Sequence, residues 1–261
     1  MQASIALEPD AAQQYVLRLA DTCLIHSQRL AEWCGHAPVL EEDIALANMA
    51  LDLLGQARAL LTHAGRMGRG VAGAAFDEDE LAFLRDERSF RNATLAELPR
   101  GDFAFCVLRN LLLATWLGAY WERLADSNDA ELAAIAGKAA KESRYHRRHA
   151  ADWVVRLGDG SDESARRLRD ALATAWPYTA ELFDDDAIDA GAAASGLGPA
   201  CSALRAGWWS ELAPVFAQAG IEAPAPTPFR SHGRQGRHSE HMGYLLAEMQ
   251  HLPRSFPGAV W

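Results

Sequence analysis

Residues 111–121 form the most apolar run of the 261-residue chain, and Arg109 and Glu122 bound it. A membrane-spanning helix needs about 20 apolar residues, so this run is too short to cross a bilayer. We therefore predict a helix buried inside the protein. Large apolar side chains occur all round it, so other helices must enclose it on most sides. They are Leu111, Leu112, Leu113, Trp116, Leu117, Tyr120 and Trp121.

Three further segments are long enough to enclose this helix, and their apolar residues recur at helical spacing. Asp10 is a candidate N-cap of the first helix, and Gly35 and Pro38 provide its stop. Residues 126–129 form so short a link that the third and fourth helices should be antiparallel neighbours. We predict the long helices at residues 10–34, 41–63, 102–125 and 129–157, and shorter ones at 77–88, 164–183 (interrupted at Pro177), 198–218 and 240–251.

This pattern predicts an all-α fold, because the period-two alternation of exposed strands is hardly seen. We expect residues 1–261 to form a single domain, a four-helix bundle with additional shorter C-terminal helices.

Composition excludes several classes of function. The net charge of -10 and the pI of about 5.4 leave no basic face for nucleic acid. The phosphate-binding motif GxxxxGK[ST] does not occur, and no Ser-His-Asp or Cys-His constellation is apparent. No signal peptide opens the sequence, and the four cysteines form no CxxC pair. We expect a cytoplasmic protein, not bound to a membrane, whose cysteines are reduced and buried: Cys23, Cys34, Cys106 and Cys201.

A four-helix bundle can hold two iron ions if two helices each supply a glutamate and the other two each supply a Glu-x-x-His pair. The second helix offers Asp52 and Gln56 where such a pair belongs, and the fourth offers Glu142, His146 and His149. The third helix has no acid between its ends, and the first has a cysteine near its middle. The sequence therefore contains no complete set of iron ligands.

Several blocks of the sequence resemble the C subunit of the phenylacetyl-CoA 1,2-epoxidase, and they extend over almost the whole chain. The blocks are residues 27–38, 51–58, 141–146, 152–160, 179–183 and 246–250. The resemblance implies a ferritin-like fold and a structural, non-catalytic subunit. It also implies a partner, a paralogous A subunit that holds the di-iron centre and binds the CoA thioester. Other components of the complex would bring electrons from NADPH, so we expect no cofactor in this chain.

The A-subunit ligand pattern can be placed on this chain residue by residue. Cys23 then stands where the glutamate of the first helix would be, and Leu53 and Gln56 stand for the first Glu-x-x-His. Ser143 takes the place of the second glutamate, while His146 keeps its histidine. A single neutral imidazole without carboxylates is a weak iron site, so these positions predict a lost metal centre.

Two interpretations of the remaining polar residues stay open. Asp52, Gln56, Glu142 and His146 would form a hydrogen-bonded network in place of the metal, with His146 bonded to a neighbour such as Glu142. Alternatively, an independent ferritin-like di-iron oxidase would use an unusual ligand set of Asp52, Glu142, His146 and His149.

Residues near the C-terminus also have to be weighed as a metal site. His238 and His241 have the HxxH spacing of a metal-ligand pair, but no second pair completes a set of four ligands. The alternative interpretation is therefore a helix start capped by Ser239. The residues concerned are His238, Glu240, His241, Glu248 and His251.

The loop of residues 230–238 is the most basic segment of this acidic chain. Arg230, Arg234 and Arg237 would contact the phosphates of phenylacetyl-CoA or an acidic partner, or else lie on a solvated loop. A third hypothesis for the whole chain is therefore a helical CoA-binding module.

Overall fold

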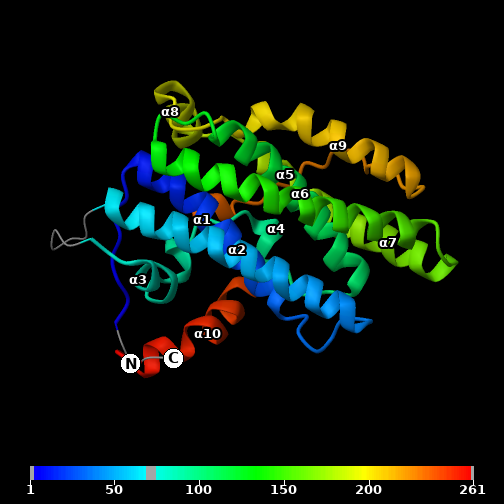
Figure 1. Cartoon of the computed structure of the whole chain (residues 1–261), viewed down its shortest axis with the longest axis horizontal. Helices are drawn as coiled ribbons and strands as arrows, with labels where there is room; N and C mark the ends of the chain where they lie inside the picture. The colour runs from blue at the N-terminus through cyan, green and yellow to red at the C-terminus, as the bar shows by residue number, and fades with distance from the viewer. Residues whose placement is uncertain (1–2, 69–74, 260–261) are drawn as a thin grey trace.

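The computed structural model describes residues 3–68 and 75–259 and is built from helices (Figure 1). Within those residues there is no strand, only an isolated bridge between His232 and Arg237. The all-α prediction is therefore confirmed. The long helices are α1 (Ala11–Ala31), α2 (Leu40–Met67), α5 (Phe103–Leu124) and α6 (Ala130–Gly158).

The long helices pack as two pairs, α1 against α2 and α5 against α6, and contacts between α2 and α6 join the pairs. The predicted neighbourhood of the third and fourth helices is thus confirmed. Aspartate side chains cap the starts of α1, α5 and α6, whereas Val39 at the start of α2 makes no side-chain cap bond. The backbone N–H of Gln13 donates to the Asp10 carboxylate over 2.8 Å, and that of Phe105 donates to Asp102 over 2.9 Å.

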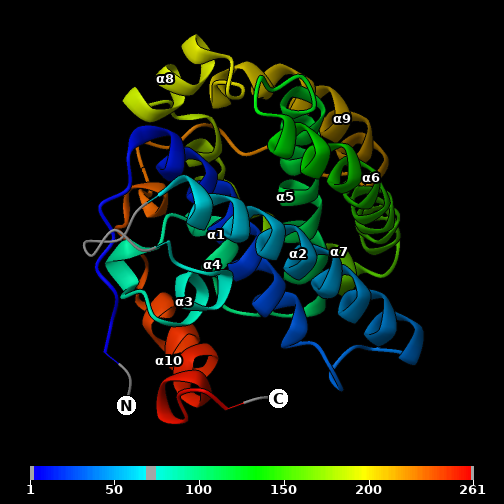
Figure 2. The ribbon, with the colours of Figure 1, turned by 60° about the vertical axis from the view of Figure 1, so that its left-hand side comes forward.

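Smaller elements complete the chain. The α-helices are α3 (Glu78–Phe83), α4 (Thr94–Glu97), α7 (Asp162–Ala175), α8 (Ala187–Ser195), α9 (Arg205–Gln218) and α10 (Glu240–Ser255). The 3-10 helices are η1 (Glu87–Ser89), η2 (Trp176–Phe183), η3 (Cys201–Leu204) and η4 (Gly233–Gln235). Figures 1 and 2 show α10 at the opposite edge of the molecule from α8 and α9.

Several predicted boundaries differ from these elements. The first helix ends at Ala31, and Gly35, with a φ of 76°, lies in the turn that follows. The predicted helix over 164–183 changes to a 3-10 helix at Trp176, because Pro177 has no N–H to donate. The predicted helices over 77–88 and 198–218 each divide into a 3-10 and an α-helix, and α10 continues beyond residue 251. We did not predict α4 or α8.

The core surrounds α5, as its apolar run predicts. Two of the described helices, α2 and α5, have the length and apolar composition of a membrane-spanning helix, but the buried core helices of soluble proteins have them too. The apolar window of α5 is 83% buried, and the indole N–H of Trp116 donates to the Leu182 carbonyl over 2.9 Å. The window of α2 is only 44% buried, so apolar side chains remain on its outer side.

The cysteines are free thiols, and three of them are buried as predicted. Cys34 is exposed, so the prediction of burial is wrong for it. It follows the end of α1, where the chain turns away from the core.

Candidate functional site

The five positions that the resemblance aligns with the expected iron ligands of the A subunit are buried inside the molecule on α1, α2 and α6. They are Cys23, Leu53, Gln56, Ser143 and His146. The amide of Gln56 connects all three helices. Its Nε2 donates to Oε2 of Glu142 over 2.9 Å, and its Oε1 lies 3.7 Å from the Cys23 sulfur.

His146 is held by a different carboxylate from the one we expected. Its Nε2 lies 3.0 Å from Oδ2 of Asp52 on α2, so the expected hydrogen bond of a buried histidine is present, with Asp52 in place of Glu142. Burial lowers the pKa of His146, against the opposing effect of the Asp52 hydrogen bond. One turn further along α6, Nε2 of His149 lies 2.8 Å from Oε2 of Glu42.

The four residues proposed as a network therefore form two separate cross-links between α2 and α6, with a third from His149. Each joins a side chain of one helix to a side chain of the other at hydrogen-bond distance. The helix pairs are thus fixed by polar contacts in the region where a di-iron protein would place its metal.

These residues do not fit a di-iron centre. Leu53 has no donor atom, and burial raises the pKa of the Cys23 thiol, which favours its neutral form. The Ser143 hydroxyl is buried and has no hydrogen-bond partner among the described residues. The carboxylates of Asp52 and Glu142 are engaged by His146 and Gln56. Too little negative charge converges here to balance two iron ions.

A further polar group, which we did not predict from the sequence, lies in this interior. Nε2 of His26 on α1 lies 3.2 Å from Oδ1 of Asn110, a neutral amide side chain on α5. The Asn110 Nδ2 lies 3.3 Å from the Met49 sulfur. Burial, with the charge of Arg109, lowers the pKa of His26 to about 3, so the imidazole is neutral. The signal was visible as isolated polar residues in apolar stretches of α1 and α5.

Elsewhere in the described residues, Asp185, Asp189 and Cys201 bring possible metal-ligand atoms within 4.8 Å of one another. The Asp189 carboxylate already accepts from Arg18 over 2.9 Å, and burial raises the pKa of Cys201 to about 12. The residues weighed as a metal site near the C-terminus, His238, Glu240, His241, Glu248 and His251, do not form a ligand cluster within residues 3–68 and 75–259.

The model of the phenylacetic acid catabolic protein family matches residues 2–261. The chain belongs to this family. It is also 47% identical over 248 residues to the C subunit of the 1,2-phenylacetyl-CoA epoxidase of Escherichia coli (strain K12), across 95% of this chain and 98% of that protein. The resemblance drawn from the sequence blocks is therefore confirmed.

The arginines of the basic loop, residues 230–238, are not all free to bind a ligand. Arg234 is buried: its Nη1 donates to the Asp184 carbonyl over 3.0 Å, and its Nη2 donates to the Asp189 carboxylate. Its backbone N–H donates to Oε1 of Glu181 over 2.8 Å. The interpretation of a solvated loop is therefore wrong for Arg234, and its guanidinium is already satisfied within the protein. Arg230 and Arg237 are exposed.

The start of α10 is a structural feature as well. Ser239 caps the helix by accepting from the His241 backbone N–H over 3.4 Å, as the alternative interpretation predicts. His238 is enclosed, with Nδ1 2.7 Å from Oε2 of Glu97 and Nε2 3.1 Å from the Phe90 carbonyl oxygen. These contacts hold the loop against the segment around α4.

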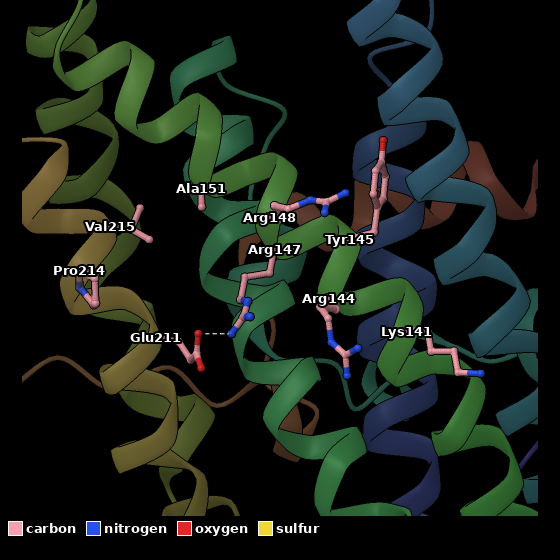
Figure 3. Close-up of a pocket in the computed structure, with 9 residues that line it drawn as sticks. All are labelled: Lys141, Arg144, Tyr145, Arg147, Arg148, Ala151, Glu211, Pro214 and Val215. Carbon is pink, nitrogen blue, oxygen red and sulfur yellow. Dashed lines mark ion pairs between the residues drawn. The ribbon is translucent and has the colours of Figure 1, made fainter.

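A surface cavity of about 600 Å³ lies between α6 and α9 (Figure 3). Its lining combines cations of α6 with apolar side chains, among them Val215 and Pro214 of α9. Arg147 turns towards Glu211 of α9 and forms an ion pair with it. The cavity is distinct from the buried positions that correspond to iron ligands.

Proposed function

We propose that this chain is the C subunit of a 1,2-phenylacetyl-CoA epoxidase complex and that its role there is structural. The observation that carries the proposal is the 47% identity to the C subunit of the E. coli enzyme over 95% of the chain. We infer further that the two helix pairs form a ferritin-like four-helix bundle and that the protein acts in the cytoplasm.

In this proposal the chemistry takes place in a partner. A paralogous A subunit holds the di-iron centre and binds phenylacetyl-CoA, and a separate reductase supplies electrons derived from NADPH. The donor set of this chain supports such a division. Its inner positions carry a leucine, a neutral thiol and an unpartnered hydroxyl, and its one retained histidine is held by Asp52. The chain would then stabilise the catalytic subunit by packing against it.

The independent di-iron oxidase remains the rival hypothesis. It requires Asp52, Glu142, His146 and His149 to converge on metal, although each is engaged in a cross-link between α2 and α6. The CoA-binding module is weakened by the burial of Arg234, which leaves Arg230 and Arg237 as the exposed arginines of its loop.

Co-expression with the A subunit, followed by separation of the two proteins, tests the proposal. We expect a stable complex that epoxidises phenylacetyl-CoA, with the iron in the A subunit. The isolated chain should contain no stoichiometric iron and show no oxygenase activity. About two irons per isolated chain, the content of a di-iron bundle, would overturn the structural role if His146→Ala removed them. His251→Ala, a change of an exposed histidine, is the matched control.

A further inference from the structure

The outer side of α2 carries an apolar stripe that nothing within the described residues covers. Leu40, Ile44 and Leu51 are 72%, 54% and 63% exposed, and their spacing places them on one face of the helix. Gly55, one turn further, would meet nothing within 4 Å if it carried a Cβ. Exposed apolar side chains that gather on one face, rather than lying scattered, indicate a binding surface.

The stripe continues onto α6 through Tyr145, which is 44% exposed. Its ring centroid lies 6.2 Å from that of His146 and 6.3 Å from that of His149. Those two histidines are the ones bonded to Asp52 and Glu42 of α2, so Tyr145 stands beside α2. In Figure 3 its side chain projects from α6 on the side of α2. The two helices therefore present one continuous face.

Unpaired cations border this apolar area. Lys141, Arg144 and Arg148 are exposed on α6, and none has a hydrogen bond or ion pair with any residue of 3–68 or 75–259. All three line the cavity shown in Figure 3, where Arg147 is neutralised by Glu211. Three free cations side by side are unusual in a chain whose net charge is -10. They call for carboxylates from outside this chain.

The opposite end of the face is acidic but smaller. Glu41 and Asp152 are both exposed near the start of α2. Asp152 of α6 lies there because the contact between His149 and Glu42 brings that part of α6 beside the start of α2. A second copy of this chain would bring these two carboxylates together with three more cations. A partner that carries carboxylates around an apolar centre neutralises the cations more completely. Charge complementarity therefore favours a different protein over a second copy.

We propose that this α2–α6 face, formed by Leu40, Ile44, Leu51, Tyr145, Lys141, Arg144 and Arg148, is the docking surface for the A subunit. The contact surface of that subunit would carry an apolar stripe bordered by carboxylates. An apolar centre with a charged rim is the usual anatomy of a protein interface, and permanent partners bury the larger apolar areas. The inference rests on the proposed function and adds to it the face, the residues and the charge of the partner surface.

Two pairs of variants test the face against matched positions elsewhere. Arg148→Glu reverses a cation of the face, and Arg169→Glu makes the same change at an exposed arginine of α7. Leu51→Asp places a charge in the stripe, and Tyr244→Asp does so at an exposed residue of α10. The measurement is the Kd for the co-expressed A subunit, by calorimetry, with circular dichroism to check the fold. We expect Leu51→Asp to raise Kd by about tenfold or more, as the loss of a central interface contact does. Arg148→Glu should also raise Kd, because it sets a carboxylate against the carboxylates of the partner, while both controls bind like the wild type.

The outcomes separate the two proposals. If the wild-type chain does not bind the A subunit, the proposed function fails. If it binds and all four variants bind equally well, the function stands and the docking face is wrong. Concentration-dependent dimers of the wild-type chain that Leu51→Asp abolishes, with binding of the A subunit unchanged, would assign the face to a second copy and overturn the inference.

Discussion

The buried ion pair between Asp21 of α1 and Arg85, just after α3, provides a sharp test of what fixes this fold. Both side chains are fully buried. The Arg85 guanidinium donates to the Asp21 carboxylate, which also accepts from the Arg91 backbone N–H over 2.8 Å. Asp21→Asn keeps the shape but removes the charge that neutralises Arg85. Breaking one partner of a buried pair costs about 3–5 kcal/mol, a large part of the roughly 5–15 kcal/mol by which domains are usually stable.

Urea denaturation followed by circular dichroism measures this loss as a lower free energy of unfolding. Arg58→Gln is the control, because Arg58 pairs with Glu78 at the surface with its side chain 67% exposed, and such pairs contribute about 0–1 kcal/mol. The double variant Asp21→Asn with Arg85→Met should recover much of the stability, since no buried charge remains. A loss below about 1 kcal/mol for Asp21→Asn alone, or a double variant that is less stable still, would refute the reasoning.

Three further predictions concern the interior and the basic loop. Gln56→Leu and Glu142→Ala should each lower Tm, because the bond between them joins α2 to α6 and hydrogen bonds to charged groups contribute about 1.5–3 kcal/mol; if neither variant changes Tm, the cross-link has no structural role. The pKa of His26 is lowered to about 3 in the folded chain, so its contribution to stability is complete above the unfolded pKa of about 6.5 and is lost as pH falls towards 3. His26→Leu should therefore flatten the fall in the free energy of unfolding between pH 6 and 4 by about 1.4 kcal/mol per pH unit, and an unchanged slope in urea melts would contradict the neutral, buried imidazole. Arg234→Ala should lower Tm because Arg234 is buried against Asp189, whereas Arg237→Ala should leave it unchanged; equal Tm values would place Arg234 on the surface instead.

The long helices could be predicted because their determinants are local. Asp10 and Asp102 cap helices whose apolar residues repeat at helical spacing, and the apolar run of α5 can only be buried. By contrast, α4 spans four residues, too few to show a period, and it is helical because the whole segment is enclosed. Its existence depends on contacts with distant parts of the chain.

The same distinction explains the outcome at the candidate site. That position 53 offers no donor atom to a metal was predictable, since leucine lacks one in any geometry. The partner of His146 was not: the spacing of Glu142 and His146 places them on one helix face, but Asp52 arrives from another helix. Arg234 lies 45 residues after Asp189, and only the folded chain brings them together.

Under the proposed structural role, the three polar contacts between α2 and α6 also bear on how this protein would mature. A bundle held together by bound metal reaches its final form only after the cell delivers the ion. Here Gln56, His146 and His149 connect the helices with groups that the polypeptide itself supplies. Under the proposed structural role, the fold of this chain would be complete without delivered iron, whereas the proposed catalytic partner would still need its metal.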